Sequence, residues 1–212
     1  MNTQVKEKIE SLLLSTQRQG ITKLVDYLRD SDFFVAPASS RFHGCYEGGL
    51  AEHSLAVYVI MVDFLEKINL AEISAPGQQS LSCDSNSISI ACLLHDVCKI
   101  GAYLPNDKGG YKTNREHPKG HATLSIERIK QYIELTPAEE MMIRYHMGVY
   151  GCNEFYKPDD SQSGEYPLRG DNTKSKEERY GNSLANAWYH NPICKLLYFC
   201  DELATLRDKA TK

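Results

Sequence analysis

The sequence predicts an all-α fold in a single domain. Apolar residues recur three and four positions apart along most of the chain, which is the spacing of one face of a helix. No stretch shows the regular apolar and polar alternation of a half-buried strand, and no internal repeat is visible. A chain of 212 residues is long enough to bury one sizeable core. We therefore expect one helical bundle over residues 1–212.

The apolar spacing defines the helices in order. They are expected within residues 4–29 (two short amphipathic helices) and over residues 50–64, 88–98, 120–135, 137–146 and 193–204. The start at Pro137 has its own signal, because Thr136 is a good N-cap, proline fits the first helical position and Glu139 can complete a capping box.

Polar connections separate these helices. Residues 30–47 carry Pro, Ser and Gly and are expected to form an ordered loop, and residues 106–119 form a second polar connection. Residues 153–182 are long and turn-rich, which is typical of lids, binding loops or disordered segments, and two short strands would fit inside them. We expect substrate specificity to come from these three segments.

Composition narrows the functional class. A net charge of -4 argues against a broad nucleic-acid-binding face, which usually appears as a basic patch. The seven cysteines form no CxxC pair and several lie in apolar stretches, so we expect buried thiols in a reducing compartment. No apolar run approaches the roughly 18 residues of a membrane span, and residues 1–15 lack the apolar core of a signal peptide. A cytoplasmic location is expected.

Six potential metal ligands lie at predicted helix ends or on helix faces that are otherwise apolar. They are His53, His95, Asp96, His121, His146 and Asp201. A single histidine on such a face is more often a satisfied core residue than a ligand. Six polar groups buried separately, however, would each need a partner, because unpaired burial costs several kcal/mol. One shared cation satisfies them together, so the set predicts a metal site.

The ligand types and spacing suggest one or two ions. Imidazole and carboxylate suit a divalent cation such as iron, manganese, nickel, zinc, cobalt or magnesium. His95 and Asp96 would be about 100° apart on a helix, so both could reach one ion, with His53 and Asp201 completing its site. The other two histidines could hold a second ion, which Asp96 would bridge. Two such ions and two carboxylates leave about two positive charges, which suit a phosphate.

One histidine has a rival. His117 precedes Pro118 in a connection, whereas His121 opens a helix with Leu124 and Ser125 on its side. We therefore favour His121 as the ligand.

These residues fall in five sequence blocks: GGLAEHSLAV, LLHDVCKIG, KGHATLSIE, RYHMG and YFCDELAT. In this order they resemble the HD-domain superfamily of metal-dependent phosphohydrolases, especially its branch with two extra histidines and dinuclear centres, which includes many uncharacterised bacterial and phage proteins. The resemblance covers about residues 41–207 and implies an HD-type helical bundle with the helices of residues 4–29 packed on it. One departure is Cys98, where members often have glycine.

Several basic residues could contact substrate. Lys99 lies four residues after His95, one helical turn on, and the resemblance implies that it neutralises a substrate phosphate. Arg41 and His43 precede the GGLAEH block and could contact phosphate, and Lys119 is a weaker candidate. Arg41 and His43 could equally be surface residues, and the alternative for Lys99 is a solvated lysine at a helix end.

The leading hypothesis is hydrolysis of a phosphate ester in a nucleotide or similar small phosphorylated molecule. A metal-activated water would attack phosphorus, Asp96 could orient it, and Lys99 would stabilise the phosphoryl oxygens. The alternatives are a di-iron oxygenase on the same scaffold, a non-catalytic nucleotide-binding module, and a nuclease. The expected partner is thus a small phosphorylated substrate and not a membrane, and a nucleic acid is expected only under the nuclease alternative. No oligomeric state is predicted.

Overall fold

The computed structural model describes residues 2–67, 83–148, 184, 187–188 and 191–210. Within these residues the chain forms seven α-helices, one 3-10 helix and one two-stranded sheet, which confirms the all-α prediction. The elements are α1 (Thr3–Ser15), α2 (Ile21–Asp30), α3 (Gly49–Lys67), α5 (Ser85–Leu94), η1 (Val97–Lys99), β1 (Tyr103–Pro105), β2 (Tyr111–Thr113), α6 (His121–Lys130), α7 (Pro137–Tyr145) and α10 (Pro192–Ala210).

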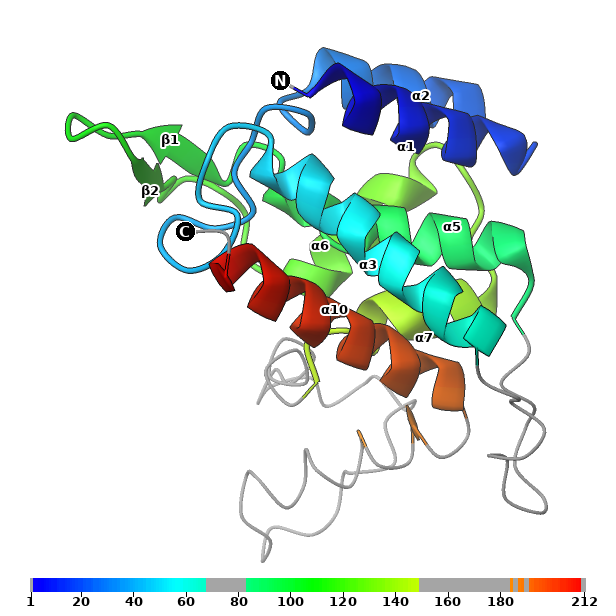
Figure 1. Ribbon diagram of the computed structural model, residues 1–212. Helices are drawn as coiled ribbons and strands as arrows, with labels where there is room; N and C mark the ends of the chain where they lie inside the picture. The colour runs from blue at the N-terminus through cyan, green and yellow to red at the C-terminus, as the bar shows by residue number, and fades with distance from the viewer. Residues whose placement is uncertain (1, 68–82, 149–183, 185–186, 189–190, 211–212) are drawn as a thin grey trace, which may run out of the picture.

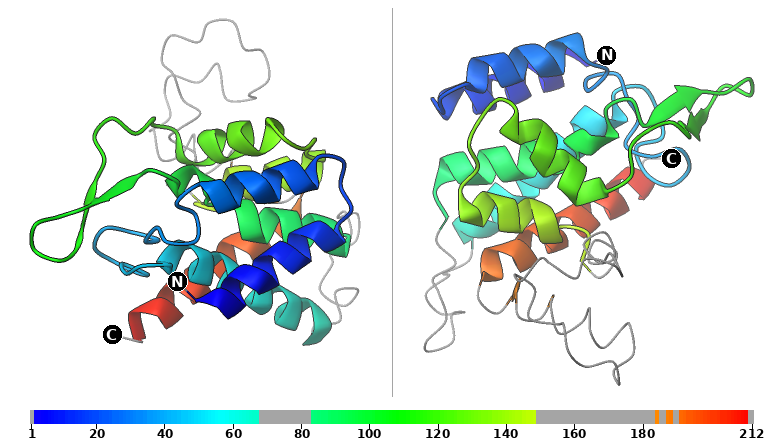
Figure 2. Two further views of the ribbon diagram at one scale, coloured as in Figure 1. Left: turned by 90° about the horizontal axis from the view of Figure 1, so that it is seen from above. Right: turned by 180° about the vertical axis from the view of Figure 1, so that it is seen from behind.

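Helix α5 lies at the centre of the bundle. Its residues from Ser87 to Leu94 are all buried, as expected of a helix that is apolar on every side. Helices α3 and α7 pack against α5, α10 packs across α3 and α7, and α6 contacts α7 and η1. Helices α1 and α2 form a hairpin on one side of the bundle, where α1 reaches α3 and α5 (Figures 1 and 2). The ends of several helices therefore meet near the end of α5.

The helix expected over residues 88–98 ends earlier than predicted. Helix α5 stops at Leu94, and Asp96 leaves the helical conformation, with φ -105° and ψ 13°. The chain continues as the short η1, whose polar backbone groups are satisfied by side chains of α6. The Ser125 hydroxyl accepts from the Cys98 amide, and the Arg128 guanidinium donates to the carbonyl of Val97. These bonds replace those of a continuing helix, so His95 and Asp96 do not share one helix as expected.

The small sheet also differs from expectation. Strands β1 and β2 pair antiparallel with Tyr103 opposite Thr113. Strand β1 lies just before the connection of residues 106–119, and β2 lies inside it. Asn106 closes the turn by accepting from the amides of Lys108 and Gly110. Three-residue strands are too short to show alternation, which is why the sequence pattern missed them. The segment of residues 153–182, where strands were considered, lies outside the described residues.

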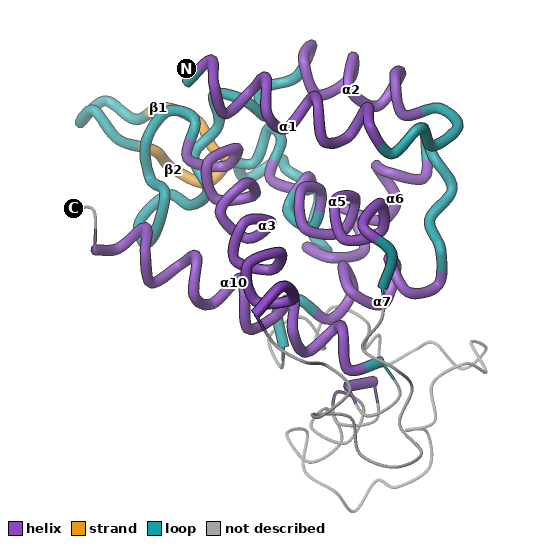
Figure 3. The backbone as a smooth tube through the Cα atoms, turned by 45° about the vertical axis from the view of Figure 1, so that its right-hand side comes forward, coloured by secondary structure: helices purple, strands orange, loops and turns teal. Residues whose placement is uncertain are grey.

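A buried ion pair ties the α1–α2 hairpin to the bundle. Glu139 in the first turn of α7 is fully buried and pairs with Arg18 at 2.7 and 3.2 Å. The Ser87 hydroxyl of α5 lies 2.7 Å from the same carboxylate. Thr136 and Glu139 also form the predicted capping box. The pair and the serine thus join the α1–α2 connection and α7 to α5, and Figure 3 shows how these helices are arranged.

The loop of residues 31–48, the β1–β2 hairpin and the end of α10 lie at the same end of the bundle (Figures 1 and 2). In the described residues, no helix combines the length and the apolar character needed to cross a membrane.

Candidate metal centre

The six predicted ligands meet in the interior, although they come from five different helices or helix ends. His53 lies on α3, His95 and Asp96 follow α5, His121 opens α6, His146 follows α7 and Asp201 lies on α10. All are buried except His121, which is partly exposed. Long-range packing of the helices therefore brings together residues as far apart in sequence as His53 and Asp201.

Asp96 is the hub of the cluster, and its two carboxylate oxygens face different neighbours. Oδ1 lies 2.8 Å from Nε2 of His121 and 3.7 Å from Nε2 of His146. Oδ2 lies 3.4 Å from Nε2 of His95 and 3.8 Å from Nε2 of His53. One carboxylate thus stands between two pairs of histidines.

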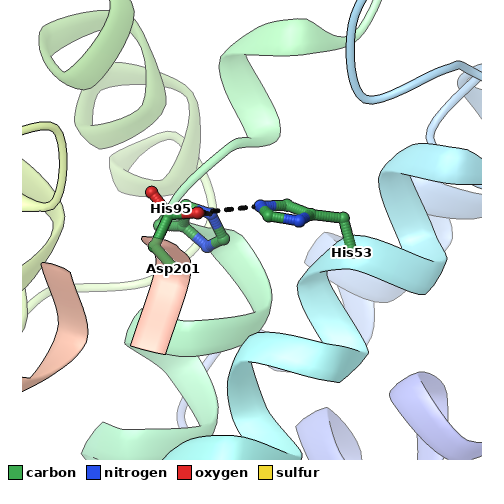
Figure 4. Close-up of side chains that lie close together, drawn as sticks. All are labelled: His53, His95 and Asp201. Carbon is green, nitrogen blue, oxygen red and sulfur yellow. Dashed lines mark hydrogen bonds and ion pairs between the residues drawn. The ribbon is translucent and has the colours of Figure 1, made fainter. Parts of the chain in front are cut away.

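Asp201 joins the pair on the Oδ2 side. Its Oδ1 lies 2.9 Å from Nε2 of His53 and 3.9 Å from Nε2 of His95 (Figure 4). The potential ligand atoms of these three residues lie within 4.8 Å of one another. We call His53, His95, Asp201 and Oδ2 of Asp96 the Oδ2 half-site. We call His121, His146 and Oδ1 of Asp96 the Oδ1 half-site.

The cluster contains buried polar atoms that protein groups leave unsatisfied. In the described part of the chain, seven buried side-chain nitrogen or oxygen atoms lack a hydrogen bond, and four belong to predicted ligands: Nε2 of His95, His121 and His146, and Oδ1 of Asp96. Nε2 of His121 and Oδ1 of Asp96 approach closely but without hydrogen-bond geometry. Buried polar groups are costly without partners, and four that converge on one region fit a cation.

The opposite ring nitrogens explain why Nε2 of His95 and Nε2 of His146 lack a hydrogen bond within the described residues. Nδ1 of His95 lies 2.8 Å from the carbonyl oxygen of Cys92, and Nδ1 of His146 lies 2.6 Å from that of Ile143. A carbonyl can only accept, so Nδ1 must carry the proton, and in the neutral imidazole Nε2 keeps its lone pair. This is the arrangement by which proteins orient histidine ligands toward a metal. The residues therefore fit a divalent ion.

The carboxylates keep their negative charge despite burial. Burial favours the neutral form of Asp96, but the Lys99 ammonium and the neighbouring His95 hold its pKa well below its usual range. Burial also opposes the charge of Asp201, and the contact with His53 outweighs it, so its pKa is lowered. Burial would lower the pKa of Lys99, but Asp96 raises it above its ordinary value. Asp96 thus faces the Lys99 ammonium and the imidazoles, whereas Asp201 faces imidazoles.

The two histidines of the Oδ1 half-site have opposite shifts. Burial lowers the pKa of His121 below its ordinary value although Asp96 lies close by. Burial acts in the same direction on His146, but its interaction with Asp96 is stronger and raises its pKa. His121 is consequently neutral near pH 7, which is the form that binds metals.

The structure separates the remaining candidates. Lys99 belongs to the cluster, because its Nζ lies 2.6 Å from Oδ2 of Asp96. His43 lies beside the cluster, with its ring centroid 4.9 Å from that of His53, and its Nε2 is another buried atom without a hydrogen bond in the described residues. Arg41 and Lys119 have exposed side chains, and neither makes a hydrogen bond or ion pair with the cluster within the described residues.

The rival ligand and the neighbouring carboxylate point elsewhere. Nε2 of His117 lies 3.1 Å from the carbonyl oxygen of Ile100 rather than near Asp96. Glu52, one residue before His53, accepts from the Tyr46 hydroxyl at the surface. The structure thus brings His121, and not His117, to the cluster.

Sequence reasoning missed the residues that hold η1 in place. Arg128 donates to the carbonyl oxygens of Val97, Cys98 and Ile100 at 2.9 to 3.0 Å. Arg128 lies seven residues after His121, so both lie on one face of α6. This spacing could have predicted from sequence that Arg128 lies near the cluster. Cys98 was noted only as a departure from the family's glycine, yet its Sγ lies 3.1 Å from Nδ1 of His121. Burial raises the pKa of Cys98 to about 12, so this sulfur is a neutral thiol.

Comparison with known proteins agrees with this geometry. The model of the HD domain family matches residues 50–165, more than half of the chain. A dihydroneopterin 2',3'-cyclic phosphate phosphodiesterase of Methanocaldococcus jannaschii is 31% identical over 97 residues, which cover 44% of this chain and 35% of that protein. The match therefore spans about a third of the relative's length. No solved structure matches the chain significantly. With a family match over more than half of its length, the chain belongs to the HD domain family.

Proposed function

We propose that this protein is a metal-dependent phosphohydrolase that cleaves a phosphate ester of a nucleotide or a similar small phosphorylated molecule. One observation carries the proposal: four buried atoms of His95, Asp96, His121 and His146 lack hydrogen bonds in the described residues and converge on one region. Membership of the HD domain family supports the same reading.

The proposed ligands are the six residues of the two half-sites. Asp96 would bridge two ions, because its oxygens face different histidines at 2.8 to 3.8 Å. When bound, divalent ions supply positive charge that polarises a phosphoryl oxygen and makes water acidic enough to attack phosphorus near neutral pH. Asp96 and Asp201 supply the negative charge that holds such ions, since both have lowered pKa values.

Access to the centre is expected on one side. The side chains of His121, Asp201 and Lys99 are 21%, 13% and 12% exposed, whereas those of His53, His95 and His146 are exposed by 1% at most. A substrate would therefore approach beside Lys99. The ammonium of Lys99 can pair with a phosphoryl oxygen. Nε2 of His43, which has no hydrogen bond within the described residues, can hydrogen-bond to substrate.

The relative suggests where to look for a substrate. By its name, the archaeal protein acts on a 2',3'-cyclic phosphate, which is a phosphodiester in a ring. We therefore propose that cyclic and linear phosphodiesters of small molecules be tested beside phosphomonoesters.

The proposal is tested by a substrate screen with metal-free protein reloaded with manganese, iron, nickel, cobalt, zinc or magnesium. The panel contains nucleoside monophosphates, 2',3'-cyclic nucleotides, a linear dinucleotide and a long single-stranded RNA. We expect hydrolysis of a small phosphate ester with at least one metal, without oxygen, and its loss with a chelator. Oxygen consumption without phosphate-ester cleavage would favour the oxygenase, and cleavage of RNA alone would favour a nuclease. Nucleotide binding without turnover under every metal would contradict catalysis.

A further inference from the structure

His121 is held differently from His95 and His146, the two other predicted ligands whose Nε2 atoms lack a hydrogen bond within the described residues. His95 and His146 directly follow helices α5 and α7, so each Nδ1 reaches the carbonyl oxygen three residues earlier in the last helical turn. His121 is the first residue of α6 and follows Gly120, so it has no preceding helical turn to supply such a carbonyl. The neighbour of its Nδ1 is instead the sulfur of Cys98, at 3.1 Å.

The two kinds of partner have different consequences. A carbonyl oxygen only accepts, so His95 and His146 keep the proton on Nδ1. A neutral thiol can donate or accept, so it allows either tautomer of His121. Nε2 lies 2.8 Å from Oδ1 of Asp96, without hydrogen-bond geometry, and this negative oxygen attracts a proton on Nε2. The tautomer with that proton cannot bind a metal through Nε2. His121 is therefore not locked in its metal-binding form.

The position of the thiol is itself fixed. The amide of Cys98 donates to the Ser125 hydroxyl at 3.1 Å, and its carbonyl accepts from Arg128 at 3.0 Å. Both partners lie on α6, the helix that begins with His121. Cys98 is thus held against the ring by the same helix, and not by chance contact of a mobile side chain.

The potential ligand atoms of Asp96, Cys98 and His121 lie within 4.8 Å of one another, but the direction of the His121 ring gives the sulfur an outer role. The sulfur lies beside Nδ1 of His121, whereas Nε2 of the same ring is the atom that faces Asp96. A metal bound at Nε2 would therefore have the ring between itself and the thiol. A weak thiol hydrogen bond orients a ligand less firmly than a carbonyl does.

We propose that Cys98 is the positioning residue for His121, and that the half-site containing Oδ1 of Asp96 consequently holds the weaker of two ions. This inference rests on the metal centre of the proposed function. Ion binding is then stepwise, and the Oδ2 half-site binds its ion first. The Oδ1 half-site binds an ion when the proton of His121 lies on Nδ1, which donates it to the sulfur of Cys98 in a hydrogen bond. The ring keeps one proton throughout.

Equilibrium dialysis against manganese tests this directly. Wild-type protein is expected to bind two ions with unequal affinity. Cys98→Ala removes the partner of Nδ1 and should lower the affinity for the more weakly bound ion by about tenfold or more, a typical loss for a residue that orients a ligand. The affinity for the more tightly bound ion should change by less than about twofold. Cys98→Ser should recover part of the loss, because a hydroxyl also donates and accepts. The matched control is Cys194→Ala, a buried thiol on α10, which should bind like wild type.

Several outcomes would overturn the inference. These are a single bound ion in the wild type, no change in Cys98→Ala, or an equal loss at both ions while thermal unfolding shows a folded variant. Cobalt supplies an independent readout, because a thiolate ligand gives sulfur-to-metal charge-transfer absorption. We expect none, and its appearance would make Cys98 a direct ligand instead. Failure of phosphate-ester hydrolysis with two ions bound would remove the proposed function and leave this inference standing.

Discussion

The ammonium of Lys99 lies 2.6 Å from Oδ2 of Asp96, the oxygen that also faces His95 and His53. Lys99 lies in η1 just beyond α5, and its pKa stays above the ordinary value despite burial, because Asp96 is negative. This pair places a permanent positive charge at the edge of the metal centre, where a phosphate would carry negative charge.

Replacing Lys99 tests that role. Lys99→Met keeps much of the side-chain volume and removes the charge, so we expect kcat to fall by about 100-fold or more, as for loss of a group that stabilises transition-state charge. Manganese affinity should change far less, since Lys99 is not a ligand. Steady-state kinetics on the substrate found in the screen, together with dialysis, measure both. Lys119→Met is the control, because Lys119 is exposed and makes no hydrogen bond or ion pair with the cluster within the described residues; an equal loss of kcat there would contradict the assignment.

His43 should make stability depend on pH. Burial, followed by the charges of Lys99 and His53, lowers the pKa of His43 to about 4 from an ordinary value of 6.5. Between these values the unfolded chain binds a proton that the folded chain does not, so the contribution of His43 is present above pH 6.5 and is lost as the pH falls toward 4.

The measurement compares metal-free wild type with His43→Gln by thermal unfolding from pH 7 to pH 4. The difference in Tm, wild type minus variant, should decrease as the pH falls through this window. A difference that stays constant would mean that His43 titrates normally in the folded protein.

The buried Arg18–Glu139 pair should dominate the attachment of the α1–α2 hairpin. Arg18→Met leaves the carboxylate of Glu139 buried without its cation, and we expect a loss of about 3 kcal/mol in the free energy of unfolding, the lower end for breaking a buried ion pair. Urea unfolding measures it. Arg29→Met removes a surface pair with Glu10 and should have a much smaller effect. Equal effects of the two variants would show that burial of Glu139 is unimportant.

The helices and the clustering of the six predicted ligands could be predicted from sequence, because both follow from which residues must be buried. Apolar spacing placed both bounds of α3 and α7 within three residues and the start of α10 within one, although α10 runs six residues further than expected. Thr136 with Glu139 identified a helix start that the structure confirms. The need to satisfy many buried polar groups at once pointed to one cluster, and the structure brings those six residues together.

The parts that could not be anticipated depend on contacts between distant side chains. The end of α5 before Asp96 depends on Arg128 and Ser125, which become neighbours of η1 only after folding. The contact of Cys98 with His121 arises in the same way. The sequence therefore predicted correctly that His95 and Asp96 belong to one cluster. It was wrong to place both of them on one continuous helix.

The most direct test of the metal centre is the number of manganese ions bound per chain by Asp96→Ala. Glu52→Ala is the control, because its carboxylate is adjacent to His53 in sequence but faces Tyr46 at the surface. Since Asp96 faces all four histidines and Lys99, we predict two ions in wild type and in Glu52→Ala, and no tightly bound ion in folded Asp96→Ala. A folded Asp96→Ala protein that binds two ions with wild-type affinity would contradict the account.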